Sequence, residues 1–494
     1  MVLDTNTLPN TQKHSFSDKT AVLMASNGTL GEIPAVVVVM VPLPAQGHLN
    51  QFLNIARLLS AREVPVHYIG SATHNRQAKH RVHGWEPSVI SNIQFHDFHL
   101  PPFITPSPDP CALNKFPAHF QSVFDSTVNL SKPLAALLQT LSTKARRVVV
   151  LHDSAMCFTA KEACSIPNGE AYSFHPVSAF AVLFFILERL SKSTIGDILI
   201  PDDLPDLTFE DCFSDSFAKF IHDQYDYAHF DAGDLYNTCR PIEGRFIDLL
   251  SQEKLLGNKK QWAIGPLNPI SLHVDSKSRR HNCLEWLDKQ PKNSVLYVSF
   301  GTMTSISDEQ IIALALGLEF SKQRFVWALR EADKGDIFAE EKESRKFMLP
   351  DYYEERVKGT GMIVRDWAPQ LEILAHPSTG GFLSHCGWNS CMESLSMGVP
   401  IAAWPMHSDQ PRNTMLVTEV LKVGLVVRDW AQRKEIVVPS STIKTAVNKL
   451  MVSEEGEQMR RRAKELGVDI QKEMSDGGTS VKELESFINH ISRR

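Results

Sequence analysis

The feature that most constrains the fold of this chain is a repeated order of apolar, strand-like runs and helical stretches. The first run, AVVVVMVPLP (35–44), has the continuous β-branched character of a strand buried on both faces of a parallel sheet. Apolar residues recur at helical spacing over 49–59, and VPVHYIG (64–70) and RRVVVLHDSA (146–155) are further strand-like runs. This order predicts a β-α-β unit that opens an α/β domain.

A second series of the same kind begins with SVLYVSFGTM (294–303) and a helical stretch over 305–323. Ser307 and Gln310 stand at the start of that helix with the spacing of a capping box. Later strand-like runs alternate with helical stretches: RFVWAL, GMIVRDW, GGFLSH, VPIAAWP and VGLVVRD. Strands that alternate with helices form parallel, doubly wound sheets. The sequence therefore predicts two Rossmann-like domains.

This interpretation divides the chain into five segments. Residues 1–34 lack the charge and apolar order of a signal peptide and are predicted to be a disordered extension. We expect an N-terminal domain over 35–262, a linker rich in turn-forming and charged residues over 263–293, and a C-terminal domain over 294–475. The last helix, within 476–494, is a candidate to pack back on the N-terminal domain.

Composition excludes several classes of function. A length of 494 residues suits two or three hydrophobic cores. The net charge of −6 and the pI of about 6.3 favour neither nucleic acid nor an anionic membrane as a partner. The longest apolar runs, 35–43 and 179–187, are far shorter than the roughly 20 residues of a membrane-spanning helix. The eight cysteines contain no C-x-x-C pair, which predicts reduced thiols and a cytoplasmic protein.

One stretch, GGFLSHCGWNSCMESLSMGVP (380–400), places several polar side chains where a strand is predicted to turn into a helix. Ligands of open α/β sheets bind at such places, and the free N–H groups of a helix start bind anions. Gly387 permits close approach of a phosphate, and His385 and Ser390 can add donors to it. Glu393, one turn into the helix, can accept hydrogen bonds from sugar hydroxyls. The stretch predicts a phosphate site.

Other chemistries lack their sequence patterns. No further ligands at zinc spacing surround His385, and no G-x-S-x-G elbow presents a serine nucleophile. Neither the dinucleotide fingerprint G-x-G-x-x-G nor the phosphate loop G-x-x-x-x-G-K-[ST] occurs. The D-x-D triplet of a metal-held nucleotide sugar is also absent. We therefore expect no metal, and the helix dipole together with His385 to neutralise the bound phosphate.

The 44 residues from Trp367 to Gln410 resemble, in length, spacing and identity, the signature box of plant UDP-dependent glycosyltransferases of small molecules. The resemblance implies that Trp367 stacks on uracil, that the Ala368 backbone bonds it, and that Gln370 and Glu393 bind ribose. It implies a diphosphate site formed by His385, Gly387, Trp388, Asn389 and Ser390. It also implies that Asp409 and Gln410 bind the sugar, and that Thr302 of the SFGTM loop contacts a phosphate.

The first half of the chain supplies a candidate base. His48 follows the first strand, in PLPAQGHLNQ, and a histidine can take the proton of an alcohol near neutral pH. A carboxylate on the other ring nitrogen would hold the correct tautomer, and Asp153, at the end of a later strand, fits that role and matches the family's aspartate. GHLNQ lacks the proline that usually follows the family's histidine. In this respect, and over most of residues 35–494, the chain resembles the zeatin O-glucosyltransferase branch.

The resemblance implies the two-domain GT-B fold and transfer of a sugar, with inversion, from a UDP-sugar to the hydroxyl of a small lipophilic acceptor. Glucose is the expected sugar, with xylose as the alternative. The side-chain hydroxyl of zeatin-type cytokinins is the expected acceptor, with a phenol, flavonoid or terpenoid alcohol as alternatives. No cofactor is implied besides the UDP-sugar co-substrate, and a monomer is expected. An NAD-dependent oxidoreductase and a non-catalytic binder are the competing classes.

Overall fold

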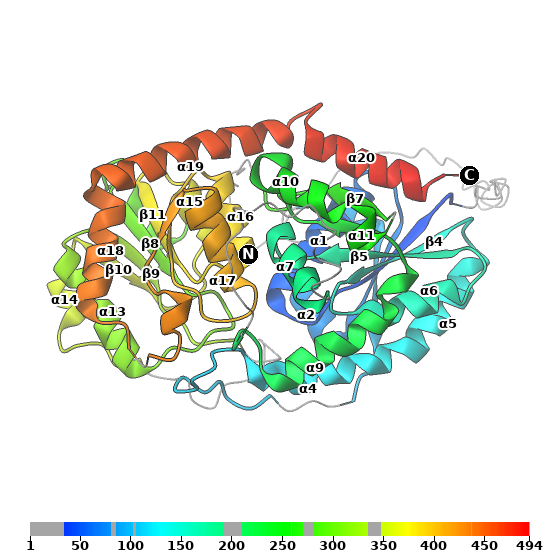
Figure 1. Ribbon diagram of the computed structural model, residues 1–494, viewed down its shortest axis with the longest axis horizontal. Coiled ribbons are helices and arrows are strands. Elements are labelled where there is room, and N and C mark those ends of the chain that lie inside the picture. Colours follow the sequence, from blue (N-terminus) through cyan, green and yellow to red (C-terminus); the bar gives the residue numbers. More distant parts are fainter. Residues whose placement is uncertain are drawn as a thin grey trace, which may run out of the picture.

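The computed structural model describes residues 34–80, 85–101, 105–190, 210–257, 259–269, 280–333, 347–435 and 437–493. Its elements form two α/β domains that lie side by side, each built around a parallel sheet with helices on both faces (Figure 1). The predicted extension 1–34 lies outside the described residues apart from Pro34.

The first sheet has the strand order β3-β2-β1-β4-β5-β6-β7, and each described pair is parallel. Its strands are β1 (Val37–Val41), β2 (Val66–Ser71), β3 (Ile93–Phe98), β4 (Val148–Asp153), β5 (Gly169–His175), β6 (Asp231–Tyr236) and β7 (Lys260–Ala263). Its helices are α1 (Gln46–Ser60), α2 (Ala72–Lys79), α3 (Pro87–Ser91), α4 (Gln121–Ser126), α5 (Ser131–Ser142), α6 (Ala160–Cys164), α7 (Ala179–Arg189), α9 (Asp215–Gln224), α10 (Arg240–Leu250) and α11 (Glu253–Leu256). The 3-10 turns are η1 (Ala118–Phe120), η2 (Thr127–Leu130), η3 (Cys157–Thr159) and η4 (Tyr225–Phe230).

The second sheet has the order β10-β9-β8-β11-β12-β13, again with parallel pairs. Its strands are β8 (Val295–Ser299), β9 (Arg324–Ala328), β10 (Gly361–Val364), β11 (Thr379–Ser384), β12 (Ile401–Ala403) and β13 (Gly424–Val426). Its helices are α12 (Asn282–Leu287), α13 (Asp308–Ser321), α14 (Tyr353–Arg356), α15 (Gln370–Ala375), α16 (Trp388–Ser396), α17 (Gln410–Met415), α18 (Ser440–Val452) and α19 (Glu454–Glu473), with the π turn η5 (Leu416–Val420) and the 3-10 turn η6 (Trp430–Gln432).

Both sheets reverse their strand order at one place, and this decides where ligands can bind. In the first sheet the reversal lies between β1 and β4, and in the second between β8 and β11. The loops that leave two such strands turn to opposite faces, which opens a crevice beyond their carboxyl ends. His48 follows β1 and Asp153 ends β4, whereas Thr302 follows β8 and His385 follows β11. The residues predicted for chemistry therefore lie at the reversal points.

The strand-like runs identified in the sequence correspond to β1, β2, β4 and β8 to β13. The sequence prediction missed β3, β5, β6 and β7, because polar residues interrupt the apolar pattern in GEAYSFH and DAGDLY, for example. One of the two hydrogen bonds of the predicted capping box is present. Ser307 Oγ accepts from the Gln310 N–H at 3.3 Å, but the Gln310 side chain bonds the Val438 backbone instead.

The segment predicted as a linker, 263–293, contains structured residues. Leu284 and Leu287 of α12 are buried in the same apolar cluster as Tyr297 and Phe382 of the second sheet. The strands of the first sheet fall within 37–263 and those of the second within 295–426. The exact first and last residues of each domain, as stated from the sequence, remain predictions.

The C-terminal helix α20 (Thr479–Ile491) packs on the first domain, although α19 before it belongs to the second (Figure 1). Phe487 is fully buried, with its ring centroid 5.3 Å from that of Trp262 and 5.4 Å from that of Tyr172. Arg147 of the first domain also donates to the carbonyl of Ile491, at 3.3 Å. The last turns of the chain therefore tie the two domains together.

A separate apolar cluster contains residues of both domains, among them Phe180, Ile242, Trp388 and Leu395.

In the described part of the chain, no helix combines the length and the apolar character that crossing a membrane requires.

Replacement of Phe487 by alanine is expected to lower the free energy of unfolding by about 3–5 kcal/mol, because it leaves a cavity among Trp262 and Tyr172. Denaturation by urea measures this loss. The matched control is Phe320→Ala, since that ring is 47% exposed, and it should cost about 1 kcal/mol or less. Equal losses in the two variants would contradict the packing role of α20.

Candidate active site

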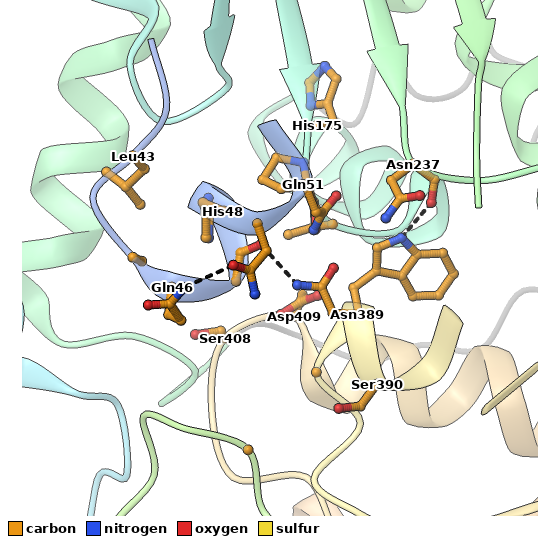
Figure 2. A pocket seen from close by; sticks show the side chains of 18 of the residues that line it. Leu43, Gln46, His48, Gln51, His175, Asn237, Asn389, Ser390, Ser408 and Asp409 are labelled. Carbon is orange, nitrogen blue, oxygen red and sulfur yellow. Dashed lines mark hydrogen bonds between the residues drawn. The ribbon is translucent and has the colours of Figure 1, made fainter. Parts of the chain in front are cut away.

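A cavity of about 800 Å³ lies between the domains, at the carboxyl ends of the strands of both sheets. Figure 2 shows residues of α1 and β5 and Asn237, which follows β6, on one side of it and residues of α16 and the loop before α17 on the other. Every site residue predicted from the sequence lines this cavity: His48, Asp153, Thr302, Trp367, Ala368, Gln370, His385, Gly387, Trp388, Asn389, Ser390, Glu393, Asp409 and Gln410.

His48 and Asp153 form a hydrogen-bonded pair. The Nδ1 atom of His48 lies 2.7 Å from Oδ2 of Asp153, whose side chain is fully buried, whereas the His48 side chain is 27% exposed. The backbone N–H of Ala155 donates to Oδ1 of the same carboxylate at 2.9 Å, which fixes its orientation. A proton on Nδ1 leaves Nε2 without one, so Nε2 is free to accept a proton from a ligand in the cavity.

The electrostatic environment keeps this histidine basic. Burial lowers the pKa of His48, but the charge and hydrogen bond of Asp153 and the charge of Asp409 outweigh burial. The pKa therefore stands above the ordinary value of 6.5. The neighbouring His152 does not compete for the carboxylate, because its Nε2 bonds Asp231 at 2.7 Å and its Nδ1 the backbone carbonyl of Asp153.

The start of α16 has the geometry of an anion site. Gly387 is the N-cap, and no side chain caps the first N–H groups of the helix. The preceding Cys386 is buried at φ +62°, a strained conformation for a residue with a side chain. The ring of His385 lies between two glycines, since a Cβ built on Gly387 would stand 2.4 Å from its Nε2 and one on Gly301 2.6 Å. Only glycine fits at either place.

The charge state of His385 differs from the expectation. Burial lowers the pKa of His385 to about 4, so the ring is neutral at pH 7 before a ligand binds. In the described part of the chain its Nδ1 is buried and has no hydrogen-bond partner. The imidazole can therefore donate one hydrogen bond to an anion, while the neutralising field comes from the peptide groups of α16.

Residues of β8, α15 and α16 form a polar group beside this helix start. The Nε2 atom of Gln370 donates to Glu393 at 2.7 Å and to the Ser390 hydroxyl at 3.0 Å, while Tyr297 contacts Gln370 Oε1 at 3.3 Å. Trp367 is 52% exposed, and the guanidinium of Arg330 stands 5.3 Å from its ring centroid. A large exposed indole at the mouth of a cavity can stack on a flat base.

Asp409 and Gln410 stand at the start of α17. Burial raises the pKa of Asp409 to about 6, against the hydrogen bond from Asn413 at 2.7 Å. The Oε1 atom of Gln410 accepts from the backbone N–H groups of Met406 and His407. The amide carbonyl of Gln410 therefore shapes its own loop, and its amide nitrogen lies 3.3 Å from Nε2 and 3.4 Å from Nδ1 of the His407 ring.

Two hydrogen bonds from α16 cross the cavity to the first domain (Figure 2). The amide of Asn389 donates at 2.9 Å to the carbonyl of Gly47, the residue directly before His48. The indole N–H of Trp388 donates to the Asn237 carbonyl at 2.8 Å. The helix that carries the anion site is thus held beside the helix that carries the histidine.

Comparison with known proteins identifies this arrangement. Residues 34–269 match the family model described as "Glycosyltransferase, N-terminal domain", and 271–454 match "UDP-glucoronosyl and UDP-glucosyl transferase". The chain is 52% identical to the zeatin O-glucosyltransferase of Phaseolus lunatus, over 93% of this chain and 97% of that protein. It belongs to the UDP-glycosyltransferase family. It is also 49% identical to the zeatin O-xylosyltransferase of Phaseolus vulgaris, over 94% and 100% of the two chains.

Solved structures agree with this family and with the GT-B fold. Phytolacca americana UGT2, complexed with UDP-2fluoro-glucose and pterostilbene, superposes with a TM-score of 0.72 at 27% identity, covering 92% of this chain and 100% of that one. A UDP-glucosyltransferase from Polygonum tinctorium gives 0.74 at 26%, covering 93% and 99%. The glycosyltransferase is therefore an enzyme that uses a UDP-sugar as co-substrate. The competing classes, an oxidoreductase and a non-catalytic binder, are set aside.

The structure also reveals cavity residues that the sequence prediction missed. In the sequence, HLPPFITPSPDP (99–110) and SFHPVSAFAVLFF (173–185) are the two stretches expected to wall the acceptor pocket. Residues of 173–185 line the cavity, whereas the described residues of 99–110 do not, and 102–104 lie outside the described part. Asp231 and Asp234 of β6 line it too. The one available signal was the pair of aspartates in DAGDLY, an unusual composition for a buried strand.

Asp153→Asn is expected to lower the pKa of His48, because it removes the charge that raises this pKa and keeps the burial that lowers it. Titration of the imidazole Cε1–H by NMR, with His48→Gln to assign the signal, measures the shift. Asp223→Asn, on the exposed face of α9, should leave the midpoint unchanged. An unaltered midpoint in Asp153→Asn would show that the carboxylate does not control this histidine.

Proposed function

We propose that this glycosyltransferase transfers glucose from UDP-glucose to the side-chain hydroxyl of a zeatin-type cytokinin, with inversion at the anomeric carbon. The observation that carries the proposal is the His48–Asp153 pair, which shares one cavity with the uncapped start of α16. The acceptor class rests on the similarity to proteins named as zeatin O-glucosyl- and O-xylosyltransferases.

We assign the donor contacts as the sequence resemblance implies. Trp367 and the Ala368 backbone bind uracil, and Gln370 and Glu393 bind ribose. The N–H groups of Gly387 and Trp388, with His385, Asn389, Ser390 and Thr302, bind the diphosphate, and Asp409 and Gln410 bind the sugar. The uncapped N–H groups of α16 and the open ring nitrogen of His385 support this assignment, because a diphosphate supplies the partners that they lack.

In the reaction that follows, Nε2 of His48 takes the acceptor proton while the acceptor oxygen bonds to the anomeric carbon. The bond from that carbon to the diphosphate oxygen breaks on the opposite side, and its electron pair leaves with UDP. Asp153 stabilises the imidazolium that forms. The α16 dipole stabilises the charge that develops on the leaving oxygen. In-line displacement converts an α-linked sugar into a β-linked product.

Binding of the diphosphate in this scheme needs peptide dipoles and no divalent cation. We further propose that the enzyme acts as a monomer in the cytoplasm. Glucose is the favoured sugar, with xylose as the alternative, since relatives with both names match this chain at similar identity.

Gly387→Ala tests the donor site. The added methyl group would stand 2.4 Å from His385 Nε2, so the ring or the helix start must move, and UDP affinity should fall by 10-fold or more. Calorimetric titration with UDP measures it. In Gly244→Ala the new carbon meets chiefly the flexible Arg240 side chain, and UDP affinity should not change. Equal affinity in both variants would contradict the anion site.

A panel assay tests the reaction itself. Chelator-treated enzyme is incubated with UDP-glucose or UDP-xylose and with trans-zeatin, cis-zeatin, a flavonoid or a terpenoid alcohol, and products are read by mass. We expect a zeatin O-glucoside, and a loss of roughly 10²–10⁴ in kcat in His48→Ala with UDP affinity retained. Turnover only with non-cytokinin acceptors would refute the acceptor, turnover only with added metal would refute the metal-free site, and full activity of His48→Ala would refute the base.

A further inference from the structure

A polar wall closes the part of the cavity that the donor and the catalytic pair do not use. It consists of Ser173 and His175 of β5 and of Asp231 and Asp234 of β6, all of which line the cavity. Ser173 pairs in register with Asp234, and the ring of His175 stacks on that of Tyr236 at 4.7 Å with an interplanar angle of 10°. In Figure 2, His175 lies on the far side of Gln51 from Ser390 and Asp409.

The hydrogen bonds of this wall leave several polar positions without a partner among the described residues. His175 Nε2 lies 3.0 Å from Asp234 Oδ1, and Gln261 donates to the other oxygen at 3.0 Å. A proton on Nε2 leaves Nδ1 of His175 as an acceptor. Asp231 bonds His152 through Oδ1 alone. Within the described residues, the hydroxyl of Ser173, which is 2% exposed, has no partner.

Charged groups face the wall from every neighbouring element. His152 of β4 pairs with Asp231, and Asp231 raises the pKa of this histidine. Lys259, just before β7, lines the cavity and donates to the Ala228 carbonyl of η4 at 2.6 Å. Burial raises the pKa of Asp234, but His175 and Lys259 outweigh it, so this carboxyl stays ionised at neutral pH.

Such a wall is unsuited to an entirely apolar acceptor. Covering an ionised carboxylate and an unpaired hydroxyl with a hydrocarbon would cost free energy, because no group would replace the lost water. A flat heteroaromatic ring with N–H donors would instead bond the open acceptors on Asp231, His175 and Ser173. An aminopurine has this chemistry, with N–H groups on its ring and on its exocyclic nitrogen.

The position of the wall fits an acceptor whose hydroxyl reaches His48. Asp153, the partner of His48, ends β4, while the wall stands on β5 and β6. Adjacent strands are about 4.8 Å apart, so Asp153 and Asp234 stand on strands separated by roughly 10 Å. A short alkyl chain between the ring and the hydroxyl bridges a distance of this order.

We infer that Ser173, His175, Asp231 and Asp234 form the base-recognition end of the acceptor site and bind the purine ring of the acceptor. This inference rests on the proposed cytokinin activity and adds the residues that distinguish a purine-bearing alcohol from other alcohols. These residues bind and orient the acceptor and take no part in the proton transfer by His48.

Ser173→Ala and Asp231→Asn test the wall. Ser173→Ala removes a hydroxyl that has no partner in the described structure, so stability should not fall, while Asp231→Asn preserves shape and removes charge. We measure kcat and KM for trans-zeatin and for 2-methylbut-2-ene-1,4-diol, which reproduces the side chain without the purine. KM for zeatin should rise about 10-fold in Ser173→Ala and about 10- to 100-fold in Asp231→Asn. Neither KM for the diol nor UDP affinity should change.

Adenine separates the failure of this inference from the failure of the proposed function. Adenine should inhibit the wild-type enzyme competitively against whichever acceptor it uses, and should inhibit both variants less. Zeatin turnover with no adenine inhibition, or with KM unchanged in both variants, would overturn the wall and leave the function standing. If the wild-type enzyme does not turn over zeatin, the proposed cytokinin activity is wrong. Adenine binding would still decide whether the wall recognises a purine.

Discussion

Parallel pairing of every described strand is the constraint on which the rest of the structure depends. It brings the carboxyl ends of β1 to β7 to one edge and those of β8 to β13 to another. Each reversal of strand order then opens a crevice at a defined place on its edge. Because the crossing bonds and α20 hold the domains together, the two crevices form one cavity. A histidine from one sheet can therefore act on a ligand held by the other.

The two histidines of the site show how environment divides the chemistry between the domains. His48 is partly buried and His385 lies between two glycines, and burial lowers the pKa of each. A buried carboxylate reverses the shift for His48, whereas His385 has no such neighbour and keeps a pKa of about 4. The His48 ring is therefore the more basic of the two, and the His385 ring is neutral at pH 7. The difference in pKa arises from hydrogen bonding to Asp153, because this carboxylate bonds Nδ1 of His48, whereas Nδ1 of His385 has no partner among the described residues.

Much of the second domain could be predicted from the sequence, because its site residues are nearly consecutive. From Trp367 to Gln410 the chain supplies the loops that follow β10, β11 and β12, and these strands come in the same order along the sequence and across the sheet. The pairing of His48 with Asp153 was also predictable, since both follow strongly apolar strands. The neutral state of His385 was not, because it depends on how completely Gly301 and Gly387 enclose the ring.

The strands β5 and β6 were missed for a related reason. Strand prediction relies on apolar character, but in GEAYSFH and DAGDLY four polar residues line a cavity instead of packing in a hydrophobic core: Ser173, His175, Asp231 and Asp234. A polar residue at a strand end is locally indistinguishable from a turn residue. Only the register between the strands, which sets Ser173 beside Asp234, brings these separate signals to one place.

The bond from Asn389 to the Gly47 carbonyl links the first turn of α16 to the first turn of α1. One amide group thus contacts the backbone directly before His48, while it projects from the helix start to which we assign the diphosphate. The amide nitrogen carries two N–H groups, so a diphosphate that bonded the second one would add to the bond with Gly47 without having to replace it. A change at the donor side that shifted this amide would also act on the backbone before His48, and by linkage the effect would be equal in both directions.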